Sequence, residues 1–197
     1  MNYSEVKYYD TANGIGVRTT LFVSGCRRHC KECFNECTWS FSYGKPFDGK
    51  VQEEILESLA PDYIDGLTLL GGEPFEPENQ RALLPFLHMV RERYPKKSIW
   101  AFSGDTWEEI RCGEGGGELA PHLKEGHARC EVTDEILSLL DLLVDGPFIL
   151  EQKDLTLRFR GSRNQRILDV PASLREGRPV PADLPYARSG RRESTDM

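Results

Sequence analysis

The sequence predicts an α/β domain with a parallel sheet, and three observations lead to that fold class. Short runs of β-branched and large apolar residues alternate along the chain with segments of helical apolar spacing, the order that crossover connections between parallel strands produce. Four of the predicted strands end in loops that contain glycine. The length of 197 residues suits one compact domain with a sizeable core.

The first half of the chain supplies two strands and two helices. A strand is predicted at 17–25, where VRTTLFVSG is rich in β-branched and aromatic residues. A helix follows at 48–60, because apolar residues at helical spacing come after an aspartate that can cap it. The short apolar run at 66–74 predicts a strand that ends in a glycine pair. A second helix covers about 78–94, and we expect a kink or break at Pro85 inside it.

The later elements are shorter. We expect a strand at 98–104, a short helix at 106–111, a glycine-rich loop at 112–130, a helix at 133–140, and strands at 141–148 and 154–162. The last of these alternates apolar and polar residues, which is typical of a half-exposed strand. From residue 171 the chain is rich in proline, arginine and small polar residues. We therefore expect one domain at 1–170 and a poorly ordered tail at 171–197.

Charge and composition exclude several classes of protein. The formal net charge of −7 argues against non-specific binding to nucleic acid, which requires a basic face. The N-terminus has no apolar core of a secretion signal, and no apolar run is long enough for a membrane helix. We therefore expect a cytoplasmic protein without membrane or nucleic-acid partners. Thiols stay reduced in the cytoplasm, so clustered cysteines there indicate metal binding or catalysis.

Four cysteines lie close together in GCRRHCKECFNECT, directly after the first strand. Cys26, Cys30 and Cys33 have the spacing C-x3-C-x2-C, which can hold three irons of a four-iron cluster and leave the fourth iron open, as in a catalytic metal centre. In the alternative, Cys37 joins them and closes a structural zinc site or an electron-transfer cluster. The spacing favours the first interpretation, because structural zinc sites usually pair two separate C-x2-C motifs.

The strand ends indicate where a ligand binds. In open α/β sheets, ligands bind beyond the carboxyl ends of the parallel strands. The motifs SGC, LLGGEP, FSG and VDGPF all lie at such ends. We therefore expect the cysteine loop and the glycine loops to belong to one site.

These motifs resemble a known family. C-x3-C-x2-C after a first strand and GGEP after a second are similar to the landmarks of the radical S-adenosylmethionine superfamily. More narrowly, four segments resemble, in the same order, the activating proteins of anaerobic ribonucleoside-triphosphate reductases: GCRRHCKECFNECTW (25–39), LLGGEPFEPEN (69–79), LLVDGPF (142–148) and RFRGSRNQRILD (158–169). NGIGVRT (13–19) also resembles the small activases of glycyl-radical enzymes, and the resemblance covers about residues 1–170.

The resemblance implies a fold and an activity. The fold is an open partial (β/α) barrel of parallel strands. A 4Fe-4S cluster held by Cys26, Cys30 and Cys33 binds S-adenosylmethionine at its open iron and cleaves it reductively. The resulting radical removes a hydrogen atom from a glycine of the partner, the large subunit of an anaerobic ribonucleoside-triphosphate reductase. Flavodoxin or ferredoxin is the electron donor implied by the family.

The resemblance also implies a binding site for S-adenosylmethionine. The implied cofactor-binding residues are Gly71, Gly72, Glu73 and Pro74 at the methionine amino group, Glu32, Cys33 and Phe34 along the adenosine, and Ser103 and Asp145 at the ribose or the methionine carboxylate. An aspartate at a strand end is equally typical of a turn or cap. The aromatic Phe34 follows the third cysteine, as in the reductase activases, but Lys31 and Glu32 stand where those proteins usually have Pro-Gly.

Several residues remain outside this scheme. Cys37 is interpreted as a bystander, and Arg18 as an exposed arginine. Four residues of the loop 112–130 can form a zinc site, although a variable surface loop is the simpler interpretation: Cys112, His122, His127 and Cys130. The segment 161–169 either docks the reductase or is a surface turn before a final strand.

Two other functions stay open. The first is another radical S-adenosylmethionine enzyme, either an activase of a different glycyl-radical enzyme or a small-molecule enzyme. The second is a non-enzymatic zinc or electron-transfer module built on four cysteines. In that module Cys37 is as necessary as Cys33, and S-adenosylmethionine has no effect on the metal.

Overall fold

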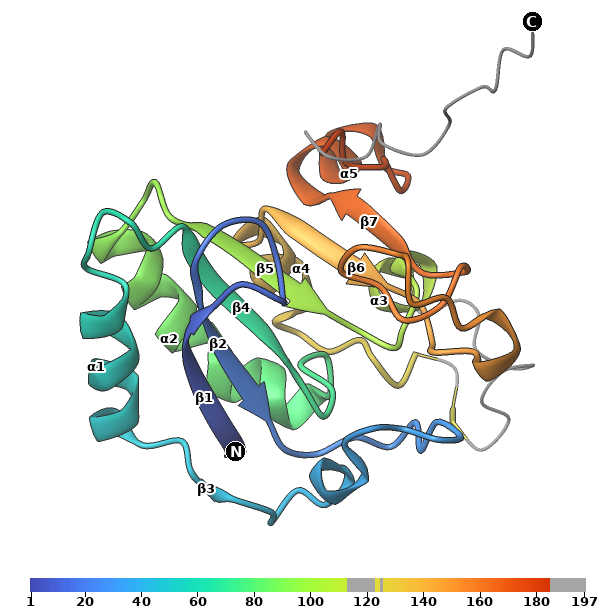
Figure 1. Ribbon diagram of the computed structural model, residues 1–197, viewed down its shortest axis with the longest axis horizontal. Coiled ribbons are helices and arrows are strands. Elements are labelled where there is room, and N and C mark those ends of the chain that lie inside the picture. The colour runs from blue at the N-terminus through green and yellow to red at the C-terminus, as the bar shows by residue number, and fades with distance from the viewer. Residues whose placement is uncertain (113–122, 125, 185–197) are drawn as a thin grey trace, which may run out of the picture.

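A single mixed sheet organises the chain, as seen in the computed structural model, which describes residues 1–112, 123–124 and 126–184 (Figure 1). The strands lie in the order β3-β1-β2-β4-β5-β6-β7. Their bounds are Asn2–Asp10 (β1), Arg18–Val23 (β2), Lys45–Pro46 (β3), Gly66–Gly71 (β4), Ser98–Phe102 (β5), Leu142–Asp145 (β6) and Arg166–Asp169 (β7). The middle strands β2, β4, β5 and β6 are parallel, whereas β1, β3 and β7 pair antiparallel with their neighbours. The predicted α/β class and central parallel strands are confirmed.

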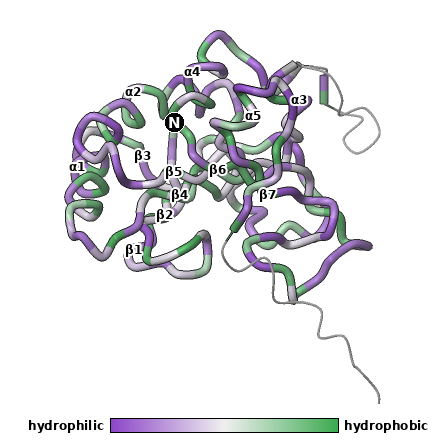
Figure 2. The backbone as a smooth tube through the Cα atoms, turned by 90° about the horizontal axis from the view of Figure 1, so that it is seen from above, coloured by the Kyte–Doolittle hydropathy of each residue, from purple (hydrophilic) through white to green (hydrophobic). Residues whose placement is uncertain are grey.

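Helices α1, α2 and α4 lie along one side of this sheet (Figure 2). The α-helices are α1 (Gly49–Ser58), α2 (Pro77–Arg93), α3 (Trp107–Cys112), α4 (Thr133–Ser138) and α5 (Val170–Glu176), and two 3-10 turns are η1 (Glu36–Trp39) and η2 (Leu150–Gln152). Asp48 caps α1, because its Oδ1 accepts hydrogen bonds from the backbone N–H groups of Lys50 and Val51. Of the expected kink or break at Pro85, the break does not occur, because α2 continues through this residue.

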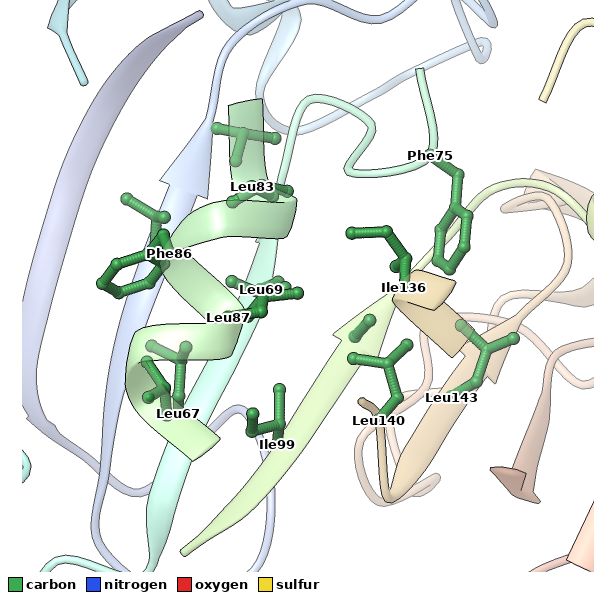
Figure 3. Close-up of a cluster of buried hydrophobic side chains, with 14 of the residues drawn as sticks. Leu67, Leu69, Phe75, Leu83, Phe86, Leu87, Ile99, Ile136, Leu140 and Leu143 are labelled. Atoms are coloured by element: carbon green, nitrogen blue, oxygen red, sulfur yellow. The ribbon is translucent and has the colours of Figure 1, made fainter. Parts of the chain in front are cut away.

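The core lies between the sheet and these helices, and strand periodicity decides which residues enter it. In β4, Leu67 and Leu69 face the core, where α2 covers them with Leu83, Phe86 and Leu87 (Figure 3). Buried contacts of Leu83, Phe86 and Leu87, on either side of Pro85 in the sequence, explain why α2 tolerates a proline that removes one of its hydrogen bonds. The alternate residues of the central strands face the opposite side of the sheet.

That opposite face is polar at one end, where Arg18 lies. Arg18 is 1% exposed and donates hydrogen bonds from Nε to the Thr68 hydroxyl at 2.7 Å and from Nη2 to the Leu67 carbonyl at 2.7 Å. Its guanidinium also lies over the ring of Trp100, 5.3 Å from the centroid. Burial lowers the pKa of Arg18 to about 10, so it stays charged at neutral pH. The expectation of an exposed arginine is therefore wrong: Arg18 binds β2 to β4 and β5.

The segment 154–162 is not a strand, contrary to the prediction from its alternation. It forms turns, with Leu155 88% exposed, while the ring of Phe159 packs edge-on against Trp100 at 5.4 Å. The final strand is β7 instead, at 166–169. The segment therefore lies against the face of the sheet that the helices leave uncovered.

Two further elements were not expected from the sequence. The polar N-terminal residues form β1, which pairs with β2. Helix α5 follows Asp169, whose Oδ1 accepts a 2.7 Å hydrogen bond from the backbone N–H of Ala172. The predicted tail from residue 171 thus contains a helix, and residues 185–197 lie outside the described part of the chain. Within the described residues, no helix is long and apolar enough to cross a membrane.

Candidate cofactor site

A cavity of about 490 Å³ opens at the carboxyl ends of the parallel strands. The loops after β2, β4, β5 and β6 all contribute to its wall, as the strand-end motifs predicted. The predicted site residues that line it are Cys26, Cys30, Glu32, Cys33, Phe34, Gly71, Gly72, Glu73 and Ser103. Pro74 and Asp145 are not among the described residues that line it.

The cysteine loop folds back on itself after β2. The Gly25 backbone N–H donates to the Thr38 carbonyl at 2.7 Å, and the Cys26 N–H donates to the Trp39 carbonyl at 3.1 Å. The ring of His29 stacks on Trp39 with a centroid distance of 4.5 Å. These contacts hold both ends of the loop, so the cysteines between them are brought to one place.

Three of the four clustered thiols face the cavity. Cys26 is buried, and Cys30 and Cys33 are partly buried in the cavity wall. Cys37 is exposed, does not line the cavity, and directs its Sγ to the side-chain oxygen of Asn35 at 3.3 Å. The arrangement therefore offers three sulfur ligands from one loop.

Burial raises the pKa of the Cys26 thiol well above its ordinary value, and nearby Glu73 adds to the shift. Burial also raises the pKa of Cys30, while the positive charge of Arg28 opposes this shift. Both thiols therefore keep their protons at neutral pH until a metal displaces them. Thiolate sulfur is the usual ligand of iron–sulfur clusters, so three thiols in the wall of one cavity have the donor chemistry that such a cluster requires.

The glycine pair after β4 is required by close backbone contact. Gly71 has φ +115°, and a Cβ there would lie 2.7 Å from backbone atoms of Val23. A Cβ on Gly72 would lie 2.6 Å from the carbonyl oxygen of Gly25. The Glu73 N–H donates to that same carbonyl at 2.9 Å. The pair is thus more than a turn, since it lets the loop after β4 touch the cysteine loop.

Glu73 uses its side chain to join two loops. Its carboxylate accepts hydrogen bonds from the Ser103 hydroxyl at 2.9 Å, from the Gly104 N–H at 2.7 Å and from the Phe75 N–H at 2.9 Å. Burial, with the charge of Asp105 as a second cause, raises the pKa of Glu73 to about 8. Ser103 and Glu73 therefore both line the cavity while bonded to each other.

A buried ion pair beside the cysteine loop was not predicted. Arg28 is 4% exposed and contacts the Asp105 carboxylate through Nη1, with Glu109 Oε1 3.8 Å away. On the other side, His127 Nε2 lies 2.7 Å from Asp105 Oδ1. Arg28 and Asp105 are 77 residues apart in the sequence, so no local spacing reveals the pair. The one available signal was the position of Arg28 between two cysteines.

Comparison with known proteins identifies the family. A family model described as a 4Fe-4S single cluster domain matches residues 12–168. A relative from Pasteurella multocida (strain Pm70), named anaerobic ribonucleoside-triphosphate reductase-activating protein, is 40% identical over 171 residues, which are 85% of this chain and 96% of the relative. A relative of the same name from Haemophilus influenzae is 40% identical over 169 residues, which are 85% of this chain and 97% of the relative. One from Escherichia coli (strain K12) is 35% identical over 167 residues, which are 84% of this chain and 96% of the relative.

The chain belongs to this family of reductase-activating proteins. The resemblance seen in the sequence motifs is confirmed. The matched 4Fe-4S single cluster domain of the activating protein contains all three cavity cysteines.

The side chain of Asp145 makes its contacts outside the cavity wall. Its buried carboxylate accepts a 2.7 Å hydrogen bond from the Trp107 N–H at the start of α3 and a 2.9 Å bond from Arg166 Nε. Arg166 also contacts Glu108 Oε2 at 2.8 Å. The carboxylate of Asp145 is thus bound by residues distant from it in sequence. The segment 161–169 consists of turns followed by β7, the order that the surface-turn alternative expected.

The loop 112–130, which was considered as a zinc site, does not bring metal ligands together in its described part. His127 contacts Asp105, and the Sγ of Cys130 lies 3.7 Å from the hydroxyl of Thr133. His122 lies outside the described residues, as does the side chain of Cys112. Among the residues described, the three cavity cysteines included, no group of three or more His, Cys, Asp or Glu side chains is placed to hold a single metal ion.

Proposed function

We propose that the chain activates an anaerobic ribonucleoside-triphosphate reductase by reductive cleavage of S-adenosylmethionine at a 4Fe-4S cluster, which produces a glycyl radical on the reductase large subunit. One observation carries this proposal: three thiols line the cavity, and the fourth thiol of the motif points away from it. Family membership supports the same partner, because the relatives are named for the reductase that they activate.

Each part of the cavity wall has a proposed role. Cys26, Cys30 and Cys33 would hold the cluster, which when bound supplies the electron that cleaves the sulfonium. The loop of Gly71 and Gly72, which lines the cavity, would present backbone groups to the amino group of the methionine. Apolar wall residues would exclude water from a reactive radical, which favours transfer to the partner over side reactions: Leu70, Phe102, Phe148 and Phe159. Phe34 also lines the cavity but is 86% exposed.

The sheet is proposed to be the open partial barrel of this class of enzymes. Helices cover one face of the central parallel strands, and the cavity lies against the other face together with the segment 154–162. An open side is what an activase requires, since a glycine of another protein must reach the cavity. The proposed electron donor is flavodoxin or ferredoxin, and the proposed location is the cytoplasm.

The test is electron paramagnetic resonance of the anaerobically reconstituted, reduced protein with and without S-adenosylmethionine. We expect a cluster signal in the wild type and in Cys37→Ala that shifts when S-adenosylmethionine is added. In Cys33→Ala the S-adenosylmethionine-dependent signal should be lost. A signal that ignores S-adenosylmethionine, or that disappears in Cys37→Ala, would mean a closed four-thiolate site and would overturn the proposal.

The partner requires a second measurement. After incubation with the reductase large subunit and S-adenosylmethionine, the reductase should show the spectrum of a glycyl radical. Cleavage of S-adenosylmethionine without that spectrum would point to the activase of another glycyl-radical enzyme.

A further inference from the structure

A cluster of mostly buried ionisable side chains lies against the cysteine loop, and the proposed function gives no role to Arg28 or Asp105 within it. Its members are Arg28, Glu73, Asp105, Glu109 and His127, here called the Arg28 cluster. Arg28, Glu73, Asp105 and Glu109 are each 5% exposed or less. Charges buried to this degree interact strongly with one another and with any charged group in the adjoining cavity.

Arg28 lies at the centre of this group of ionisable side chains and belongs to the loop that carries the three thiols. Its guanidinium crosses Gly104, where a Cβ would lie 2.5 Å from Arg28 Cδ, and ends against the carboxylate of Asp105. Asp105 is fixed in turn, because its backbone N–H donates to the Ser103 hydroxyl at 2.9 Å and its carbonyl accepts from the Gly146 N–H at 3.0 Å. The positive charge of Arg28 is therefore held in one place.

The guanidinium of Arg28 lies beside the cysteines proposed to bind the iron–sulfur cluster. Arg28 lines the same cavity as Cys30 and Cys33. Arg28 also precedes Cys30 by two residues, within the loop that carries all three thiols. Two other cationic residues, Lys153 and Arg160, line the cavity from the segment between η2 and β7. Lys153 is exposed, however, and Arg160 is only partly buried. Within the described wall, Arg28 is thus the cation that is both buried and part of the ligand loop.

We propose that Arg28 tunes the reduction potential of the cluster: its guanidinium, held by Asp105, offsets negative charge at the thiolate ligands and makes the cluster easier to reduce. The inference rests on the proposed cluster. Reduction adds one electron to the cluster from a donor such as dithionite or a flavodoxin-type protein, and no bond forms or breaks. A nearby fixed positive charge stabilises the more negative reduced form, and net charge near a cluster is one determinant of its potential.

The alternative role for Arg28 is binding a carboxylate of a cavity ligand. Its Nε is buried and without a hydrogen-bond partner. However, Nε packs against Gly104, where a Cβ would lie 2.8 Å from it. Because Nε is buried, a ligand in the cavity cannot reach it without a rearrangement, so the geometry favours an effect through charge.

The test is a redox titration of the reconstituted full-length protein without S-adenosylmethionine, followed by the reduced-cluster signal. For Arg28→Gln we expect the ratio of reduced to oxidised cluster at a fixed potential to fall by about tenfold, which for one electron is about 59 mV. Asp105→Asn removes a negative charge and should move the ratio in the opposite direction. Arg28→Lys keeps the charge and should stay close to the wild type. The exposed Arg81→Gln is the matched control and should cause no shift.

Opposite signs separate charge from damage. If a loosened loop exposed the cluster to water, Arg28→Gln and Asp105→Asn would shift the potential in the same direction, and the proposal would be wrong. It would also be wrong if neither variant shifted the potential, or if Arg28→Gln changed only the affinity for S-adenosylmethionine. If Arg28→Gln does not take up a cluster, Asp105→Asn decides alone, and the absence of a rise rejects the inference. A potential shift in a protein that ignores S-adenosylmethionine would uphold Arg28 while overturning the proposed radical function.

Discussion

Arg27 contacts both carboxylate oxygens of Glu76. Its backbone N–H donates to Oε1 at 2.6 Å, and its guanidinium contacts Oε2. The same guanidinium reaches Glu78 Oε1 at 2.7 Å and lies over the ring of Phe41, 4.4 Å from the centroid. Because Glu76 is the residue before α2, this contact joins the cysteine loop to the start of the longest helix.

Replacing Arg27 should loosen the cysteine loop. In Arg27→Gln the nearly buried carboxylate of Glu76 loses its cationic partner, and we expect the free energy of unfolding to fall by about 1–3 kcal/mol, less than for a fully buried pair because Arg27 is half exposed. Urea denaturation of the metal-free protein measures the change. Arg81→Gln, in helix α2, breaks an exposed pair with Glu131 and should cost less than about 1 kcal/mol. Equal effects of both substitutions would contradict the proposed link.

A methyl group on Gly72 should separate the two loops of the site. In Gly72→Ala the new Cβ meets the backbone oxygens of Gly25 and Thr38, at 2.6 and 3.0 Å, and backbone cannot move aside as a flexible side chain can. We expect the iron content after reconstitution to fall at least severalfold. Gly49→Ala at the start of α1 is the control, since a Cβ there meets nothing within 4 Å. Iron and sulfide analysis of both variants checks this; full iron loading of Gly72→Ala would refute it.

Asp145 should matter for stability and not for cofactor binding. Asp145→Asn weakens the contact to Arg166 and the hydrogen bond to the Trp107 N–H, and we expect the free energy of unfolding to fall by about 2–4 kcal/mol. The affinity of the reconstituted protein for S-adenosylmethionine should stay within about twofold of the wild type. Equilibrium binding and urea denaturation measure the two quantities. A large loss of affinity with little loss of stability would restore Asp145 as a cofactor ligand.

The contact between His127 and Asp105 should make stability depend on pH. It raises the pKa of His127 above the ordinary value of 6.5, so the protonated form stabilises the folded state. That contribution is fully present below pH 6.5 and is lost as the pH rises through the folded-state pKa. Glu73, whose pKa is raised from 4.5 to about 8, also makes the protein less stable as the pH rises from about 4.5 to about 8.

His127→Gln isolates the histidine contribution. Melting temperatures of the metal-free wild type should fall as the pH rises from about 6.5 to about 8.5, and the fall should be smaller in the variant. The difference between the two curves belongs to His127, because Glu73 is present in both proteins. Parallel curves would mean that His127 does not gain a proton on folding.

Local patterns predicted most elements because strands and helices have different apolar periods. The prediction of a strand at 154–162 failed, because the segment has the alternation of a strand but, among the described residues, pairs with no strand of the sheet. Leu155 and Phe159 alternate with polar residues, yet one is exposed and the other packs on Trp100. The opposite error hid β1, whose charged residues lie in a partly exposed edge region that an apolar pattern does not mark.

By itself, the sequence determined the α/β class, the C-x3-C-x2-C motif and the glycine pair, because these depend on neighbours within a few residues. Only the tertiary structure decided that Cys37 faces away from the cavity, that Asp145 is engaged by Arg166, and that Arg28 meets Asp105. The physical reason is distance along the chain. Contacts between residues far apart in sequence form where parallel strands bring their carboxyl ends to one edge, and that meeting depends on strand order and packing rather than on local spacing.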